Sequence, residues 1–398
     1  MAKENMSKLE RLIQQYCPDG VEYVKLDSVA NICRGTRVVK SQLSDKGYPV
    51  YQNCLTPMGY FERSNCNAGI TFVICGGAAG NVGYTDVECW AADDCEFIIG
   101  GHQVINRYIY YYLMTKQNYL LSKVRKASIP RLSPSIIKDL EIPLPPLPVQ
   151  EEIVRVLDTF TELQAELQAE LQKRKQQYNY YLDNLLNFNN INRGGYQAEV
   201  RWMKMSEVFE IRNGYTPSKA KKEFWEGGTI PWFRMEDIRQ NGRILSDSIL
   251  HITPKGVKGK GLFKANSFIL ATTATIGEHA LIIVNSLANQ QFTNLSICKS
   301  LENELSVKYV YYYFFVIDEW CKANTNVSNF ASVDMSKFYN LLIPIPSIAE
   351  QQRIVAILDR FDTLTTDLAQ GLPAEIEKRR QQYEYYRDKL LTFKRKGA

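Results

Sequence analysis

Two stretches of the chain carry apolar side chains at helical spacing over about thirty residues each. The first runs from Phe160 to Phe188 and the second from Phe361 to Phe393. Their apolar and aromatic positions recur at steps of three and four residues, which is a heptad seam interrupted by four-residue stutters. The seam positions are Leu163, Leu167, Leu171, Tyr178, Tyr181 and Leu185 in the first stretch, and Leu364, Leu368, Leu372, Ile376, Tyr383, Tyr386 and Leu390 in the second. The pattern predicts two long helices.

The two helical stretches are copies of each other. KRKQQYNYYLDNLLNF (173–188) matches KRRQQYEYYRDKLLTF (378–393), and IPLPPLPVQEEIVRVLDTF (142–160) matches IPIPSIAEQQRIVAILDRF (343–361). The chain is therefore a tandem duplication of a domain followed by a helix, with a period too long for a solenoid. Two similar helices in one chain can pack on each other as in a homodimer, so we expect a pseudo-twofold antiparallel coiled coil.

The regions before the helices consist of short apolar runs separated by Gly, Asn and Pro. ITFVICGG, CEFIIGG, SFILATTA, HALIIV and NLSIC favour strands, whereas Tyr108–Met114 and Tyr309–Val316 favour helices packed on them. We predict an α+β fold with two tandem, pseudo-symmetric, strand-rich mixed domains separated by two long helices. The expected boundaries are an N-terminal helix at 1–20, domains at 21–147 and 197–346, and helical regions at 148–192 and 347–398.

The borders of the long helices carry further signals. Prolines precede the first helix, while Ser347 and Glu350 form an S-x-x-E capping box before the second. The start of the first helix is less well defined because no Ser-led cap precedes it. Gly371 and Pro373 predict a break in the second helix. The tetrad LQAE is repeated in ELQAELQAELQ (162–172), and one tetrad adds about 6 Å of helix, so the helix resembles a ruler between two domains.

Length and composition place the chain among soluble globular proteins. It has 398 residues, 45% of them hydrophobic, which is enough for two domain cores. No run of 18 apolar residues occurs, and MAKENMSKLERLIQQ has no apolar signal core, so we expect a cytoplasmic protein without a membrane partner. The nine Cys include no C-x-x-C pair, and with three His they predict reduced thiols and no metal site.

Positive charge is concentrated in the second domain. The segment 214–264 holds ten Lys/Arg against five Asp/Glu, a surplus of five that equals the net charge of the whole chain. Such a surface fits a polyanion, although a solvated charged face is the simpler alternative. Polar loops contain the residue types that contact base edges and phosphates. The candidate nucleic-acid contacts are Arg34, Thr36, Arg37, Lys40, Gln52, Asn53, Arg63, Tyr215, Thr216, Lys219, Lys221, Arg234, Arg239, Gln240, Asn241 and Arg243.

Motifs for catalysis are missing from the sequence. It contains no phosphate-binding G-x-x-x-x-G-K-[ST], no N-P-P-[YF] of amino methylation, no G-x-S-x-G and no H-E-x-x-H. Its three His are isolated from one another. We therefore expect no catalytic residue and no cofactor in this chain, and a role in recognition and assembly.

The duplicated domains, each followed by Q-x-x-I-V-x-x-L-D and K-R-[KR]-Q-Q-Y-x-Y-Y-x-D-x-L-L-x-F, resemble the specificity subunit of type I restriction–modification systems. The resemblance covers nearly the whole chain. It implies that each variable domain is a target recognition domain for one half of a split, asymmetric site in double-stranded DNA. It also implies that the coiled coil sets the spacer and docks two methyltransferase and two restriction/translocase subunits. S-adenosylmethionine, ATP and magnesium would belong to those partners.

Two other interpretations stay open at the level of sequence. The first is a stand-alone DNA-binding regulator or anti-restriction decoy that recruits no enzyme. The second is an enzyme whose site has no recognisable motif. A stable complex with a neighbouring methyltransferase subunit would argue against the regulator, and turnover of S-adenosylmethionine or ATP by the purified chain would support the enzyme.

Overall fold

The protein is described by a computed structural model that covers residues 6–188, 200–326, 331–366 and 371–397. It consists of two compact units. The first comprises Met1–Ala169 together with Ala374–Ala398, and the second comprises Glu170–Pro373. Leu368 of the predicted seam lies outside the described residues, as do the ends of several predicted regions.

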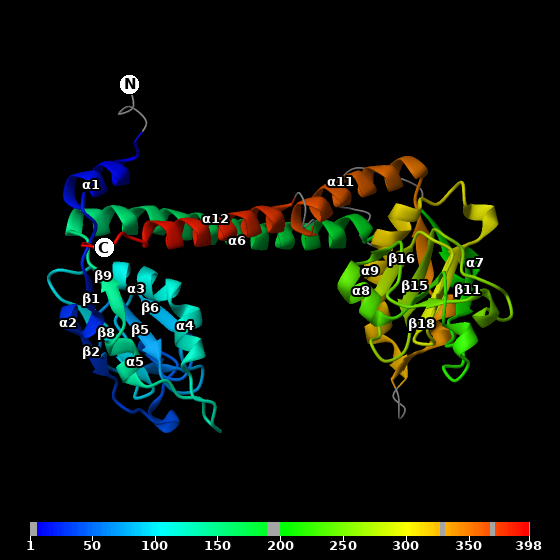
Figure 1. Ribbon diagram of the computed structural model, residues 1–398. Helices are drawn as coiled ribbons and strands as arrows, with labels where there is room; N and C mark the ends of the chain where they lie inside the picture. Colours follow the sequence, from blue (N-terminus) through cyan, green and yellow to red (C-terminus); the bar gives the residue numbers. More distant parts are fainter. Residues whose placement is uncertain (1–5, 189–199, 327–330, 367–370, 398) are drawn as a thin grey trace. The chain divides into compact units, whose positions relative to one another are not determined.

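The first unit combines an antiparallel four-stranded sheet and a smaller mixed sheet with a long helix pair (Figure 1). Its helices and strands are α1 (Lys8–Tyr16), β1 (Tyr23–Lys25), α2 (Leu26–Val29), β2 (Ala30–Arg34), β3 (Tyr48–Tyr51), β4 (Tyr60–Phe61), β5 (Ile70–Ile74), β6 (Val82–Thr85), β7 (Trp90–Ala91), β8 (Cys95–Gly100), α3 (Asn106–Thr115), α4 (Gln117–Ser122), α5 (Pro134–Lys138), β9 (Glu141–Pro143), the first part of α6 (Leu147–Leu186) and most of α12 (Leu372–Leu390).

The second unit repeats this order of elements. It holds the rest of α6 and then β10 (Arg201–Lys204), α7 (Met205–Val208), β11 (Phe209–Asn213), β12 (Ile230–Phe233), α8 (Met235–Asn241), β13 (Ile244–Leu245), β14 (His251–Ile252), β15 (Ser267–Ala271), β16 (His279–Ile282), β17 (Leu287–Ala288), β18 (Phe292–Ile297), α9 (Val307–Ala323), β19 (Thr325–Asn326), β20 (Ser332–Val333), α10 (Met335–Asn340), β21 (Leu342–Ile345) and α11 (Ile348–Thr366).

The sheets of the two units share one topology. The order β2-β8-β5-β6 in the first unit corresponds to β11-β18-β15-β16 in the second, and β4-β3-β7 corresponds to β14-β12-β17. The second unit adds β13 to its larger sheet. The central strands β5 and β15 are buried along their whole length because apolar clusters cover both faces. The predicted α+β fold with two tandem, pseudo-symmetric domains is confirmed, as are the strands and helices expected from the apolar runs.

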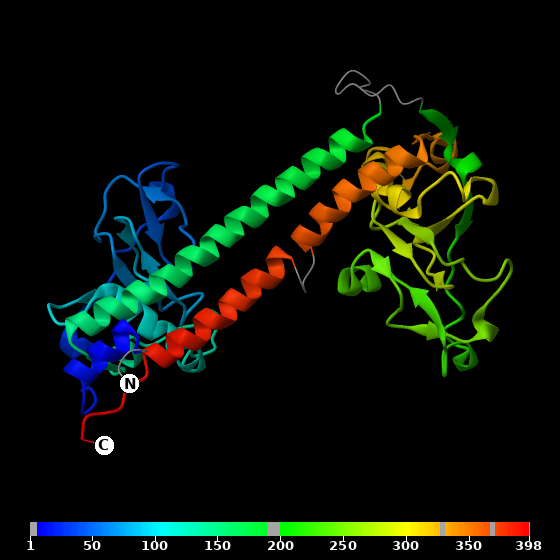
Figure 2. The ribbon, with the colours of Figure 1, turned by 90° about the horizontal axis from the view of Figure 1, so that it is seen from above.

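Each unit takes its terminal helix from the other copy of the repeat. Tyr383 and Leu391, at the end of the second copy, belong to the core of the first domain. Tyr178 and Leu186, at the end of the first copy, belong to the core of the second domain. Within the first unit α12 runs antiparallel beside the first part of α6, and within the second unit α11 does so beside the last part (Figure 2). The antiparallel pairing of the long helices is thus observed in each unit.

Stacked aromatic rings mark both helix pairs. Phe160 stacks on Tyr386 in the first unit with centroids 5.5 Å apart, and Phe361 stacks on Tyr181 in the second at 5.1 Å. In both pairs the phenylalanine opens the seam of one copy and the tyrosine lies near the end of the other. The seam therefore pairs the start of one copy with the end of the other.

The long helices are joined to their domains by matched buried polar contacts. The amide of Gln150 accepts from the Ile105 N–H at 3.0 Å and donates to the Gln103 and Pro145 carbonyls. Gln351 makes the equivalent bonds in the second unit. Gln150 and Gln351 are both fully buried. These matched bonds fix equivalent helix starts, Leu147 and Ile348, although only the second is preceded by Ser.

The second helical region is divided. α11 ends at Thr366 and α12 begins at Leu372, with Pro373 in its first turn, a position that proline tolerates. Ser347 Oγ accepts from the Glu350 N–H at 3.4 Å, while the Glu350 carboxylate pairs with Arg353. Among the described residues, no helix is both long enough and apolar enough to cross a membrane.

Candidate nucleic-acid interface

In the first domain, the loops that follow β2 and β3 meet at the segment from Ala91 to Cys95. The Gly35 N–H donates to the Cys95 carbonyl at 3.1 Å, and the Thr36 N–H donates to the Ala91 carbonyl at 2.7 Å. The Ala92 N–H donates to the Tyr51 carbonyl at the end of β3. Arg34, Thr36, Gln52 and Asn53 are thereby brought to one edge of the two sheets.

The second domain builds the same edge. The Gly214 N–H donates to the Phe292 carbonyl at 2.8 Å, the Tyr215 N–H to the Ala288 carbonyl at 2.9 Å and the Asn289 N–H to the Phe233 carbonyl at 3.0 Å. Tyr215, Thr216 and Arg234 therefore occupy places equivalent to those of the first-domain candidates.

Glycine is required where each loop leaves its strand. A Cβ on Gly35 would lie 2.2 Å from the Ala92 carbonyl oxygen, and one on Gly214 would lie 2.2 Å from the Asn289 carbonyl oxygen. Both distances are far below van der Waals contact, so neither loop could approach the crossing segment with a larger residue. The two glycines hold the loops in register with that segment.

The side chains carried by this shared backbone differ between the domains. The matching backbone hydrogen bonds show which positions of the two domains are equivalent. Arg34 corresponds to Asn213, Thr36 to Tyr215 and Gln52 to Arg234. The crossing segments also differ, because Asp94 in the first domain corresponds to Gln291 in the second. One scaffold thus presents two different sets of hydrogen-bonding groups.

Most first-domain candidates are exposed. Arg34, Thr36, Arg37, Lys40, Asn53 and Arg63 are exposed, and Gln52 is half-buried. Arg34 Nε donates to the Asp93 carbonyl at 2.8 Å. The Arg63 guanidinium lies 5.8 Å from the ring centre of Phe61, on the smaller sheet, and Arg37 and Lys40 continue along the loop beyond Thr36.

The second-domain candidates fall into separate groups. The Tyr215 hydroxyl accepts from the Lys258 N–H at 2.6 Å and donates to the Gly256 carbonyl. Thr216 Oγ1 lies 2.5 Å from Gln290 Oε1. Lys219 and Lys221 are exposed beyond them, and Arg239, Gln240 and Asn241 are exposed at the end of α8. Arg234 is half-buried, and its Nε has no hydrogen-bond partner among the described residues.

Arg243 lies in a different place from the other candidates. Its guanidinium is 3.2 Å from the Asp318 carboxylate and 3.3 Å from His279 Nδ1, and it stacks 5.1 Å from the centre of the Phe315 ring. Asp318 and His279 are 4% and 0% exposed as side chains. Arg243 is thus held against α9 rather than beside the loops around Tyr215.

The His279 imidazole should make the second unit sensitive to acid. Burial lowers its pKa below the ordinary value of 6.5, although the contact with Asp318 opposes this and Arg243 reinforces it. The unfolded imidazole takes up a proton near pH 6.5 while the folded one does not. Stability is therefore complete above pH 6.5 and falls as the pH drops below it, by up to about 1.4 kcal/mol per pH unit.

Thermal unfolding of the second unit measured between pH 7.5 and 5 checks this expectation. His279→Gln removes the titrating group and should flatten the pH dependence. His102→Gln, at an exposed position of the first domain, serves as the matched control and should leave it unchanged. Equal slopes in the wild type and in His279→Gln would contradict the assignment.

The first domain also carries a basic loop that is not among the candidate contacts predicted from the sequence. Lys123, Arg125, Lys126 and Arg131 are exposed within nine residues. Reciprocal bonds between the backbones of Arg125 and Arg131 close this loop, and the Gly77 N–H donates to the Pro130 carbonyl beside Asn53. The signal in the sequence is the cation-rich run KVRKASIPR (123–131), which lies in a domain without a strong overall surplus of positive charge.

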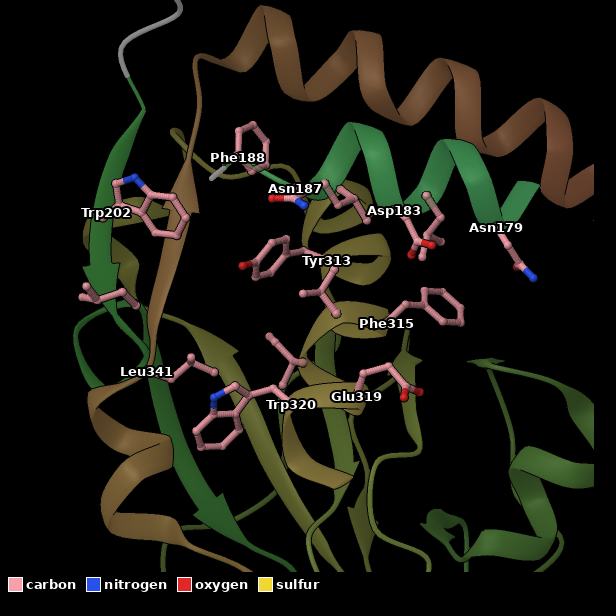
Figure 3. A pocket seen from close by; sticks show the side chains of 15 residues that line it. Asn179, Asp183, Asn187, Phe188, Trp202, Tyr313, Phe315, Glu319, Trp320 and Leu341 are labelled. Atoms are coloured by element: carbon pink, nitrogen blue, oxygen red, sulfur yellow. The ribbon is translucent and has the colours of Figure 1, made fainter. Parts of the chain in front are cut away.

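A groove lies at a helix junction of the second unit (Figure 3). It measures about 610 Å³ and is lined by the end of α6 and by α9, with Phe188, Trp202 and Tyr313 facing it. At the equivalent place in the first unit, the Tyr23 hydroxyl donates to the Phe393 carbonyl and Arg395 pairs with Glu141. The C-terminal residues therefore cover that junction in the first unit.

No group of three or more His, Cys, Asp or Glu in the described part of the chain is arranged to hold a metal ion. The two domains present two equivalent loop edges with different polar side chains.

Comparison with known proteins shows the family. The sequence matches the type I restriction modification DNA specificity domain twice, over residues 18–195 and 197–378. It is 54% identical over 204 residues to the EcoprrI type I restriction enzyme specificity subunit of Escherichia coli, covering 50% of this chain and 51% of that protein. It is 31% identical over 410 residues to a putative type I specificity subunit of Haemophilus influenzae, covering 98% of this chain and 100% of that protein.

The fold agrees with this result. A crystal structure of the type I restriction–modification S subunit from M. genitalium superimposes with a TM-score of 0.58 at 16% identity, covering 94% of this chain and 96% of that one. Two matches to one specificity domain, in the two halves of the chain, agree with the tandem pseudo-symmetric units. The chain belongs to the family of type I restriction–modification DNA specificity subunits.

Proposed function

We propose that this chain is the DNA-recognition subunit of a type I restriction–modification complex. Each domain reads one half of a split, asymmetric site in double-stranded DNA, and the coiled coil sets the spacer between the halves. The observation that carries the proposal is the pair of equivalent loop edges that present different side chains, such as Gln52 against Arg234. Two edges of one shape and different chemistry suit two different half-sites.

The catalytic chemistry belongs to other subunits in this proposal. Two methyltransferase subunits dock on the helices, and two restriction/translocase subunits join them. Those partners bind S-adenosylmethionine, ATP and magnesium. A methyltransferase must flip its target adenine out of the base stack. Its active site therefore has to be positioned over one particular base. In this proposal the cytoplasmic chain recognises the DNA sequence and thereby positions the methyltransferase.

The base and phosphate contacts come from the loops after β2, β3, β11 and β12. The contacts proposed for the first domain are Arg34, Thr36, Gln52 and Asn53. Those proposed for the second domain are Tyr215, Thr216 and Arg234. Arg37, Lys40, Arg63, Lys219, Lys221, Arg239, Gln240 and Asn241 extend these two surfaces. Arg243 would act through the position of α8 and β13, because its guanidinium is committed to Asp318.

Assembly with an enzyme separates this function from that of a stand-alone regulator, the alternative that family membership disfavours. We expect the purified chain to form a stable complex with the methyltransferase subunit encoded beside it, measured by gel filtration with light scattering. A chain that binds DNA as tightly alone as with that subunit, and forms no complex with it, would support the regulator instead.

The basic loop of the first domain should contribute phosphate contacts. Replacing Lys123, Arg125 and Arg131 together by alanine is expected to weaken DNA binding by similar factors on all sequences. Each lost phosphate contact reduces the slope of log K against log salt by about 0.9. The triple variant should therefore show a slope smaller by about 2.7, with the preferred site unchanged.

Binding of the purified complex to duplex DNA between 50 and 200 mM salt measures this slope. A triple variant of Lys173, Lys175 and Lys378, which are exposed on the long helices, carries the same charge change and should retain the original slope. A normal slope in the first variant would remove the basic loop from the interface.

A further inference from the structure

A groove in the first domain lies beside the proposed DNA contacts. It measures about 430 Å³ and is lined by β8, by the segment before it and by the basic loop that leads to α5. Its lining includes Arg34, the last residue of β2, and Cys75, which directly follows β5. The groove is within the range of sizes that take a small organic group in proteins.

The rim of this groove is cationic. Arg34, Lys123, Arg125 and Arg131 line it, and all four are exposed. Arg131 pairs with Asp94 at 3.3 Å, which orients one guanidinium along the edge. The other three form no ion pair with a carboxylate among the described residues. Such a rim suits the phosphates of a nucleic-acid backbone.

The floor of the groove is acidic. Glu96 lines it, is 4% exposed and lies on β8 opposite Arg34 in the strand register. In the described part of the chain its carboxylate forms neither a hydrogen bond nor an ion pair. Burial raises its pKa, whereas Lys138 and Arg34 oppose that shift. Asp93, also in the lining, has a buried Oδ1 without a hydrogen-bond partner among the described residues.

A largely buried carboxylate that makes no hydrogen bond or ion pair within the protein is costly unless water or a ligand in the groove binds it. The fold does not require a carboxylate at this position. The equivalent position in the second domain is Thr293, which is 1% exposed and whose hydroxyl contacts Thr272 Oγ1 at 2.9 Å and Asn213 Oδ1 at 3.2 Å. There the scaffold fills the same place with a satisfied neutral group. Glu96 is therefore a feature of the first domain alone.

We infer that this groove reads an amino-bearing base of the first half-site, with Glu96 accepting a hydrogen bond from the exocyclic amino group and the cationic rim holding the adjoining phosphates. The inference rests on the proposed function. An ionised carboxylate only accepts hydrogen bonds. In the major groove, adenine and cytosine present an amino donor while guanine and thymine present acceptors at the corresponding positions. Glu96 therefore selects adenine or cytosine at one position.

The substitution Glu96→Gln tests this assignment. Glutamine has the same shape but carries both a donor and an acceptor, so it no longer excludes bases with an acceptor edge. The preference for adenine or cytosine at one position should fall by about 5- to 150-fold, the range expected for one specific base contact. Glu96→Thr, which installs the second-domain residue, should also relax that position. Glu22→Gln, an exposed glutamate of the same unit, is the matched control.

Each variant is co-expressed with the methyltransferase subunit, and methylated adenines are mapped over a whole genome. The expected result is a relaxed base at one position of one half-site, with the other half-site and the spacer unchanged. An unchanged motif in both Glu96 variants would overturn the inference. Changes in both half-sites would also overturn it, because Glu96 would then act through the fold.

Two further outcomes distinguish a failure of the inference from a failure of the proposed function. If Glu96→Gln weakens assembly with the methyltransferase but leaves the motif intact, the groove binds a cationic side chain of that subunit and the inference fails. If the wild-type chain itself directs no methylation, the proposed function fails. Thermal unfolding shows that each variant is folded, and we expect Glu96→Gln to be no less stable than the wild type because it removes a buried charge.

Discussion

A chain that ends at Lys389 is expected to lose the folded first domain while keeping the second. The residues removed include Leu390, Leu391 and Phe393, which pack in the core of the first unit. Leu391 is 3% exposed, and loss of one buried leucine costs about 2–5 kcal/mol. A domain with a total stability on the order of 5–15 kcal/mol is expected to unfold when Leu391 and its neighbours Leu390 and Phe393 are all lost.

The backbone of the same segment adds to this effect. The Val21 N–H donates to the Lys394 carbonyl, the Lys396 N–H donates to the Val21 carbonyl, and Arg395 pairs with Glu141. Gly20 lies so close to this segment that its Cβ would be 2.4 Å from the Lys394 oxygen. The C-terminal residues thus hold together the segments at which the chain enters and leaves the first domain.

Amide hydrogen exchange measures the effect separately in each unit. In the truncated chain, β5 and β8 should lose protection whereas β15 and β18 keep it. A chain that ends at Lys396 retains all of these contacts and should match the wild type. Equal protection of both domains in the shorter chain would show that residues 390–398 are dispensable for the first domain.

Deleting the tetrad Leu167–Glu170 is expected to move the preferred spacer without altering either half-site. The deletion shortens α6 by about 6 Å, which corresponds to at most about two base-pair steps. The deletion keeps the seam. In the wild type Arg174 pairs with Glu170 at 2.7 Å, and in the shortened helix Glu166 takes the place of Glu170. Two half-sites reinforce each other only when the spacer fits, so methylation at the original spacing should fall by about 100-fold or more.

The effect is read from the spacing of methylated motifs. Gln168→Ala changes the exposed face of the same tetrad at constant length and should keep the original spacer. An altered half-site combined with the old spacer would show that α6 does not act as a ruler.

The sequence predicted the architecture because the duplication appears in residues that fold locally. The seam residues and the apolar runs gave the long helices and the central strands directly. It also predicted that the two copies pair. It did not reveal that Tyr178 and Tyr383 pack against the core of the other copy's domain, since that depends on contacts between residues far apart in the sequence, such as Tyr111 and Tyr383.

The candidate contacts were less predictable. Residue type and loop position led to Gln52 and Arg234, and the structure places them on equivalent edges. The same reasoning included Arg243, whose partners Asp318 and His279 come from distant segments. It passed over Glu96 because a single glutamate in an apolar strand gives no signal until the missing partner of its carboxylate is seen. Side-chain pairing across sheets is not encoded in local pattern.

A genome-wide map of N6-methyladenine shows whether this chain directs a methyltransferase to a split DNA site. The chain would be co-expressed with the methyltransferase subunit encoded beside it, in a host that has no methylation of its own. We expect a single bipartite motif with one methylated adenine on each strand, two different half-sites and a fixed spacer. Absence of methylation, despite a soluble chain and an active methyltransferase subunit, would contradict it.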